Sequence, residues 1–198
     1  MPAPTILHWQ ACKRVLKYLQ CTATYGIQFY NSRSLSLIAF SNANWGSNPD
    51  DRKSIGGYCI FLGPNLVSWS SKKQNVVSRS SPELEYRALA LTTSEVLWIS
   101  YLLQELKVQL RNTHVLYCDN KSAEALASNP KYHSWTKHIE LDLHFVREHI
   151  AKKELTVEHG SALINWQMYL VSHFILITLL IWEISSMSVR NLEHKGAC

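Results

Sequence analysis

A chain of 198 residues, 46% apolar and 18% charged, has the composition of a globular protein rather than a disordered one. Its formal charge of +5 is compatible with a phosphate-bearing partner but does not require one. The five cysteines are scattered without a Cys-x-x-Cys pair, which argues against a disulfide framework or a zinc ribbon and favours a reducing compartment. The N-terminus lacks the basic-then-apolar order of a secretory signal. We therefore expect an intracellular protein, cytoplasmic or nuclear, that is not secreted.

The N-terminal part of the chain predicts one helix and two strands. Residues 6–20 have helical spacing, with Lys13, Arg14 and Lys17 facing water and an apolar face formed by Leu7, Ala11, Val15 and Leu19. Strands are expected at residues 25–30 and 35–40, because the polar residues between them form a turn-like cluster. In the second strand, alternation places Ile38, Phe40 and Asn42 on one side of the sheet.

The middle of the chain predicts a hairpin followed by a long helix. Two β-like runs, residues 57–62 and 66–70, are separated by Gly63-Pro64-Asn65 and complete a three-stranded meander. Ser80-Ser81-Pro82-Glu83 combines a Ser N-cap, Pro at the first helical position and Glu three residues after the cap, so a helix is expected from there to about Lys107. Its apolar stripe is predicted to comprise Leu84, Ala88, Leu91, Ile99, Leu103 and Leu106.

The next part predicts a second set of strands and helices. A buried strand at residues 114–118 ends at Asp119, and a helix over residues 121–128 is stopped by Asn129-Pro130. A further helix and a short strand at residues 154–158 follow, the helix being marked by Ile139, Leu143, Val146 and Ile150. This order predicts an α/β fold, a mixed sheet with flanking helices.

Residues 168–182 form a 15-residue apolar run. A membrane-spanning helix needs about 20 apolar residues, so the run is marginal for that purpose. Insertion in a membrane, packing as a buried helix, and a sequence that was never selected to fold are the three alternatives, and length alone does not decide between them.

Polar side chains gather where predicted strands end or a helix begins. They are found in Ser41-Asn42-Ala43-Asn44-Trp45, at Glu83 and Glu85, and in Cys118-Asp119-Asn120. Ligand groups converge at such places in a sheet-and-helix domain, and two carboxylates there could hold a divalent ion such as Mg²⁺. The alternative is ordinary capping, with solvated glutamates at the helix start and an aspartate that caps the helix after its strand.

Several stretches, in order, resemble the ribonuclease H (RNase H) region of copia-type LTR retrotransposon Pol polyproteins. The resemblance covers about residues 8–159 and includes several independent motifs, so it is far more specific than a single short pattern. The leading Arg14-Val15-Leu16-Lys17-Tyr18-Leu19 resembles the end of the preceding reverse transcriptase. The RNase H motifs are Asp50-Asp51-Arg52-Lys53-Ser54, Val67-Ser68-Trp69-Ser70-Ser71-Lys72-Lys73-Gln74, Glu85-Tyr86-Arg87-Ala88-Leu89, Leu116-Tyr117-Cys118-Asp119-Asn120 and Thr136-Lys137-His138-Ile139-Glu140.

The resemblance implies an endonuclease that cleaves the RNA strand of an RNA/DNA hybrid with two Mg²⁺ ions held by four carboxylates. Glu85 and Asp119 correspond to two of these metal ligands. The first ligand should be an aspartate, but the motif here has Asn42 and Asn44 in place of both of its aspartates. The segment that should supply the fourth is absent, because the chain leaves the family pattern after His159. We therefore predict a degenerate active site, weak or absent Mg²⁺ binding, and impaired catalysis.

The same resemblance divides the chain and assigns its partners. Residues 1–30 correspond to the end of the reverse transcriptase, residues 31–159 to the RNase H-like domain, and residues 160–198 to a divergent tail. A reverse transcriptase domain and an RNA/DNA hybrid or other nucleic acid are the implied partners. The candidate nucleic-acid-binding residues are Arg52, Lys53, Lys72, Lys73, Arg79 and His138. The alternatives to an impaired enzyme are a non-catalytic nucleic-acid-binding module and a translated transposon relic with no selected role.

Overall fold

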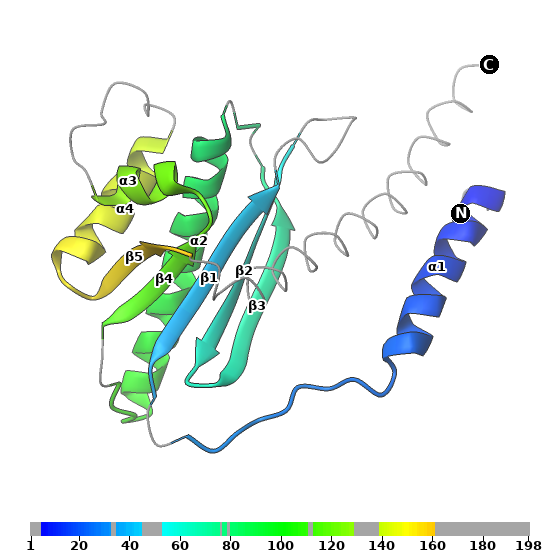
Figure 1. Ribbon diagram of the computed structural model, residues 1–198, viewed down its shortest axis with the longest axis horizontal. Helices are drawn as coiled ribbons and strands as arrows, with labels where there is room; N and C mark the ends of the chain where they lie inside the picture. The colour runs from blue at the N-terminus through cyan, green and yellow to red at the C-terminus, as the bar shows by residue number, and fades with distance from the viewer. Residues whose placement is uncertain are drawn as a thin grey trace. The chain divides into compact units, whose positions relative to one another are not determined.

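The computed structural model describes residues 5–32, 35–44, 53–75, 77–78, 80–110, 113–128 and 139–160 (Figure 1). The chain divides into two compact units, one formed by Met1–Gln28 with Leu176–Cys198 and the other by Phe29–Ile175. The apolar run at residues 168–182 lies outside the described residues, as do Trp45, Arg52, Arg79 and His138.

The first unit contains helix α1 (Ile6–Thr22), as the sequence predicts. Its basic residues are exposed, but so is Leu19 on the predicted apolar face, at 54%. The predicted strand at residues 25–30, which runs from this unit into the second, is wrong, because this segment has no strand pairing. Its alternating apolar residues Tyr25, Ile27 and Phe29 are exposed, and a strand pattern without a neighbouring strand does not form a ladder.

The second unit is built on one five-stranded sheet in the order β3-β2-β1-β4-β5 (Figure 1). Strand β1 (Leu37–Asn44) pairs antiparallel with β2 (Ile55–Leu62), which pairs antiparallel with β3 (Asn65–Lys73). On its other side, β1 pairs parallel with β4 (His114–Cys118), and β4 pairs parallel with β5 (Leu155–His159). The predicted meander and the mixed sheet are confirmed, although β1 begins and ends later than predicted.

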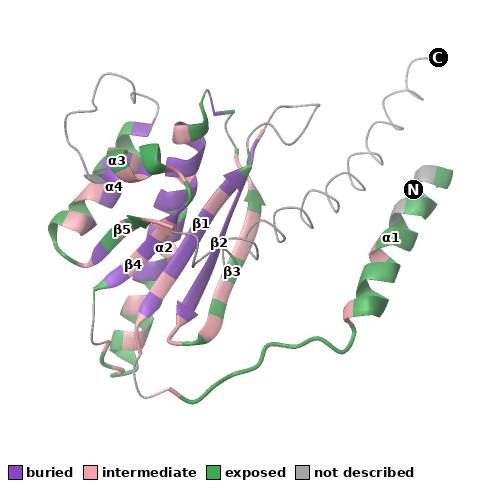
Figure 2. Ribbon diagram, viewed as in Figure 1, coloured by how far each residue is buried: buried purple, intermediate pink, exposed green. Residues whose placement is uncertain are grey.

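Three helices cover one face of this sheet: α2 (Ser81–Glu105), α3 (Lys121–Ser128) and α4 (Glu140–Ala151). The predicted start of α2 is confirmed, because the Ser80 hydroxyl accepts a hydrogen bond from the Glu83 backbone N–H at 3.3 Å. Figure 2 shows the buried residues on the inner side of α2 and along β1 and β2. The core between the sheet and these helices includes Leu37, Ile60, Leu89, Val96, Leu116, Val146 and Leu155.

The predicted stripe of α2 is correct for the residues that face the sheet and wrong for two others. Leu84, Ala88 and Ile99 are buried, whereas Leu91 is 41% exposed and Leu106 is 64% exposed. The helix packs on a single sheet face, so apolar residues on its far side have no layer above them among the described residues.

Alternate residues of the strands point to the opposite face of the sheet. There Phe40 stacks on Tyr117, with ring centroids 5.4 Å apart, and contacts the edge of Phe61. Asn42 lies on the same side of β1 as Phe40, as predicted. Among the described residues, no helix is long and apolar enough to cross a membrane.

Candidate active site

The candidate site lies at the carboxyl end of β1, where the parallel strands part. The pairing of β1 with β4 ends at Ser41 opposite Cys118, but β1 continues to Asn44 beside β2. One step further in this register, Asn42 and Asp119 occupy matching positions. The structure therefore brings together two of the predicted site residues that are 77 positions apart in the sequence.

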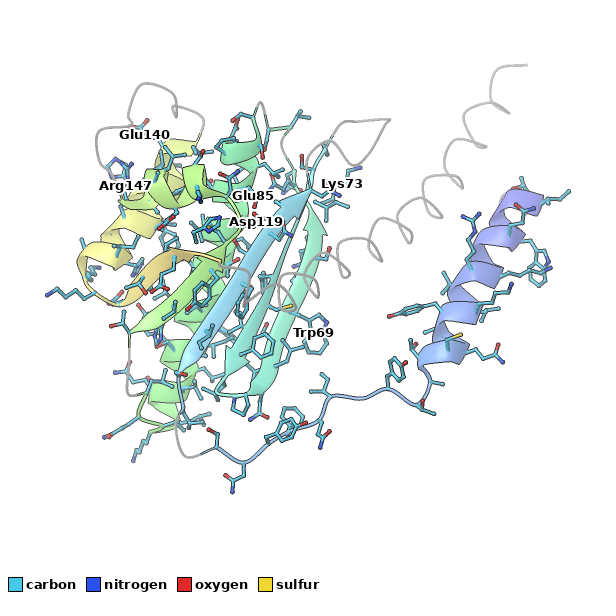
Figure 3. The ribbon with its side chains drawn as sticks, viewed as in Figure 1. Trp69, Lys73, Glu85, Asp119, Glu140 and Arg147 are labelled. Carbon is cyan, nitrogen blue, oxygen red and sulfur yellow. The ribbon has the colours of Figure 1, made fainter. Side chains whose placement is uncertain are left out.

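Glu85 reaches the same place from the first turns of α2 (Figure 3). The helix begins at this end of the sheet because β3, which precedes it, ends there. Glu85 is only 4% exposed, and the backbone N–H of Ala43 on β1 donates a hydrogen bond to its carboxylate. The Oε2 atom is buried without a hydrogen-bond partner among the described residues. Burial, followed by the nearby charge of Asp119, raises the pKa of Glu85 from 4.5 to about 8.

Asp119 directly follows β4, and the residue as a whole is exposed to solvent. Loss of solvent around its carboxyl group nevertheless raises its pKa above the usual value, although the backbone hydrogen bond and His159 act in the opposite direction. The alternative that Asp119 caps the next helix is wrong. Asn120 does so, because its Oδ1 accepts hydrogen bonds from the N–H groups of Ser122 and Ala123 at 2.8 and 3.3 Å.

The capping alternative also fails for the glutamates at the start of α2, which are buried rather than solvated. Glu83 forms an ion pair with Arg87 at 2.9 Å and is 9% exposed. Its carboxylate is thus engaged on α2 itself. Of the two glutamates, Glu85 is the one that faces β1 and Asp119.

Three of the predicted nucleic-acid-binding lysines lie at the same end of the sheet. Lys73 pairs with Ile55 and Lys72 with Gly56, and Lys53 comes two residues before the start of β2. Because Ile55 also pairs with Asn44, these lysines extend from the end of β1 to the sheet edge at β3. Lys72 is exposed, and the other two lysines are half-buried.

The side chains that the structure describes at this site do not fit the two Mg²⁺ ions that the resemblance implies. Glu85 and Asp119 supply two carboxylates, whereas Asn42 offers an amide oxygen that carries no charge. Within the described ranges there is no group of three or more His, Cys, Asp or Glu side chains that could hold a metal ion. No catalytic step through a metal is therefore assigned to these residues.

Sequence reasoning missed two groups next to the carboxylates, the Ala43 backbone N–H and the His159 ring. It named Ser41 but did not predict that the Ser41 hydroxyl is fully buried without a hydrogen-bond partner among the described residues. The Ala43 N–H serves Glu85, and the His159 ring lies with Nε2 3.1 Å from the carbonyl oxygen of Asp119. Backbone donors carry no sequence signal. His159 becomes a neighbour of Asp119 only because β5 lies beside β4.

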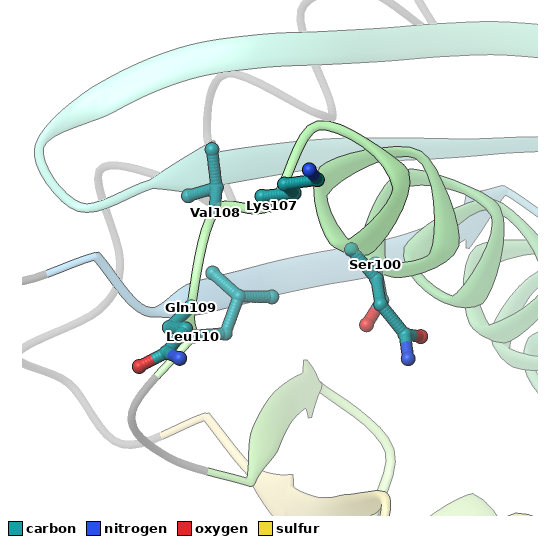
Figure 4. Close-up of a pocket in the computed structure, with 6 residues that line it drawn as sticks. Ser100, Lys107, Val108, Gln109 and Leu110 are labelled. Atoms are coloured by element: carbon teal, nitrogen blue, oxygen red, sulfur yellow. The ribbon is translucent and has the colours of Figure 1, made fainter.

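A separate pocket of about 680 Å³ opens at the far end of α2 (Figure 4). It is lined by Ser100, Gln104, Lys107, Val108, Gln109 and Leu110. The Ser100 hydroxyl lies 2.9 Å from Nε2 of His114, whose pKa is lowered by burial. Since Glu85 and Ser100 are about four turns apart along the helix, this pocket is not part of the carboxylate site.

Comparison with solved structures identifies the class of fold. The crystal structure of LC11-RNase H1 in complex with an RNA/DNA hybrid matches 73% of this chain and 99% of its own, with a TM-score of 0.51 and 13% sequence identity. The mixed sheet with flanking helices is therefore that of RNase H-like proteins. No protein-family model matches the chain.

The relatives in sequence identify the family. The retrovirus-related Pol polyproteins from transposons RE2 and RE1 of Arabidopsis thaliana are 49% and 47% identical to this chain over 161 residues, which is 81% of it. Over most of its length the chain is therefore homologous to part of copia-type, retrovirus-related Pol polyproteins, as the motifs indicated. It spans only 11% of the length of each of these two relatives.

Proposed function

We propose that this chain is an RNase H-like domain that binds RNA/DNA hybrids without cleaving them. Residues 31–159 form the binding domain in this proposal, residues 1–30 correspond to the end of a reverse transcriptase, and residues 160–198 are a divergent tail. The observation that carries the proposal is the matching position of Asn42 and Asp119 beside Glu85. An amide stands where a metal-binding acid is needed.

The expected loss of cleavage follows from charge. Four carboxylates would bring a charge of about −4 to two divalent cations, whereas Glu85 and Asp119 bring at most −2. The raised pKa of Glu85 reduces this further, since at neutral pH the carboxyl group is largely protonated in the absence of a cation. Removing metal-held stabilisation from phosphoryl transfer costs several kcal/mol, a factor of at least ~10³ in rate.

The proposed binding rests on the lysines and on the fold. Lys53, Lys72 and Lys73 lie at the end of the sheet where the candidate site lies, and phosphate neutralisation by lysine supplies affinity independently of base sequence. LC11-RNase H1, which shares the fold, has been crystallised with an RNA/DNA hybrid. Because the binding depends on charge, it should weaken steeply with added salt.

The test is a cleavage assay with the purified protein on a labelled RNA/DNA hybrid in Mg²⁺ and in Mn²⁺. We expect no turnover above background. Turnover that Asp119→Asn abolishes would overturn the proposal of inactivity. Asn42→Asp restores one acid, but we expect it to stay inactive, because the fourth carboxylate is also missing.

Fluorescence anisotropy on the same hybrid tests binding separately. We expect saturable binding that weakens as the salt concentration rises and that Lys72→Gln with Lys73→Gln weakens severalfold. Lys152→Gln, at the end of α4, is the matched control and should bind like the wild type. If the folded protein shows no saturable binding, the proposal of a nucleic-acid-binding module is rejected. That result would favour a translated transposon relic with no selected role.

A further inference from the structure

The outer face of α2 carries a line of exposed apolar side chains. Leu91, Trp98, Leu102 and Leu106 are spaced by seven, four and four residues, so they lie on one side of the helix. Their exposed fractions are 41%, 61%, 44% and 64%, and Tyr101 beside them is 54% exposed. We call these five residues the α2 stripe. It spans about 15 residues, or roughly 22 Å.

The stripe is not part of the domain core. Leu89, Thr93 and Val96 on the opposite side of the same helix are buried against the sheet. Single exposed leucines are ordinary on a protein surface, but a continuous line that includes Trp and Tyr is typical of an interaction surface. Aromatic residues of this kind often dominate the affinity of such surfaces.

The charges along the stripe have one sign over most of its length. Between Arg87 and Lys107, the only charged residues of the chain are Glu95 and Glu105. Around the helix axis they lie about 40° to either side of Leu91. Glu105 is exposed, whereas Glu95 is half-buried and its side chain is hydrogen-bonded with Tyr58 of β2. A partner with an apolar centre and basic residues that approach Glu105 and the outer side of Glu95 would complement this surface.

We propose that the α2 stripe is a docking surface for a basic amphipathic helix of a second polypeptide. A helix suits the surface because the apolar residues follow one straight line, and the side chains of a partner helix at three- and four-residue spacing can alternate with them. Lys107 directly follows the stripe and would repel a basic residue of the partner. We therefore expect the basic residues of the partner to contact the part of the stripe on the N-terminal side of Leu106.

A probe of this chemistry is provided by the sequence of α1. Its basic residues are Lys13, Arg14 and Lys17, its exposed apolar residues include Trp9, Leu16 and Leu19, and it has no acidic residue. A synthetic peptide with the sequence of residues 5–24, carrying a fluorophore, is titrated with the full-length protein under reducing conditions. The control peptide has Lys13→Glu, Arg14→Glu and Lys17→Glu and keeps the apolar residues.

We expect saturable binding of the basic peptide and at least tenfold weaker binding of the acidic one. Leu102→Glu and Trp98→Ser in the protein should each weaken the basic peptide at least tenfold. Leu141→Glu is the matched control, because Leu141 is 86% exposed on α4 and lies outside the stripe. All three positions are exposed, so we expect unchanged circular dichroism melting curves, which would show that the variants are folded.

Four results would overturn the proposal. The first is the absence of saturable peptide binding, and the second is equal binding of the basic and acidic peptides. The third is an equal loss of binding in Leu141→Glu, which would place the contact elsewhere. Sedimentation equilibrium of the protein alone adds a fourth: a dimer that Leu102→Glu dissociates would mean that the stripe pairs with a second copy of α2.

Discussion

Replacing Glu85 with glutamine should stabilise the domain, and the gain should grow with pH. Burial and the neighbouring Asp119 raise the pKa of Glu85 from 4.5 to about 8, so the folded state holds its proton more tightly than the unfolded state. The cost of losing that proton is absent below pH 4.5 and increases as the pH rises towards 8. At ~1.4 kcal/mol per pKa unit, the full cost above pH 8 is about 5 kcal/mol.

Glutamine has the same shape but cannot ionise, so the variant avoids this cost. Urea unfolding of both proteins at a series of pH values measures the difference. Integrating the shift gives a variant that gains about 3 to 4 kcal/mol more over the wild type at pH 8 than at pH 5. Asp119 and Asp142 also have raised pKa values, so the stability of the variant should still fall somewhat as the pH rises.

The matched control is Glu148→Gln. Glu148 is exposed on α4, and Lys152 lowers its pKa, so this variant should keep the wild-type loss of stability between pH 5 and pH 8. An unchanged slope in Glu85→Gln would refute the reasoning, because it would mean that the carboxylate is solvated in the folded protein.

Three further outcomes follow from the described contacts. Ser80→Ala removes the N-cap bond of α2 and should lower the free energy of unfolding by about 1 kcal/mol, measured by urea titration. Lys153→Gly should raise it by up to about 1 kcal/mol, because the backbone φ of Lys153 is 58°, in the left-handed region that glycine adopts without strain. An aromatic disulfide reagent should label the exposed thiols of Cys12 and Cys21 in the native protein. It should label the buried thiols of Cys59 and Cys118 only on unfolding. Burial raises the pKa of each buried thiol to about 12, which also suppresses the reactive thiolate.

The elements that the sequence predicted well are those whose ends are marked by local capping residues. The start of α2 was predictable because the Ser80 cap, Pro82 and Glu83 act within four residues of each other. The strand at residues 25–30 was not, because its alternation is only a local preference. A strand also needs a neighbour that offers hydrogen bonds, and periodicity carries no information about that neighbour.

The candidate site also has features that the sequence predicted and features that it did not. Resemblance to the copia-type proteins pointed to Glu85, Asp119 and Asn42, but their proximity depends on the parallel register of β1 and β4. The burial of Glu85 could not be predicted either, since a glutamate near the start of a helix is ordinarily solvated. Leu91 and Leu106 were wrongly placed on the face that packs on the sheet, because 3.6-residue periodicity shows that an apolar face exists but not which layer covers it.

Asn42 also bears on the stability of the domain without metal. An acid at this position would stand beside Asp119 and close to Glu85, and a third carboxylate would raise the pKa of Glu85 further by repulsion. With two cations bound, that repulsion is more than offset; without them, it destabilises the fold. The amide removes one charge from this group and so reduces the cost of keeping Glu85 buried. If the domain does not bind two Mg²⁺ ions, as proposed, we therefore expect it to be more stable with Asn42 than with an aspartate at this position.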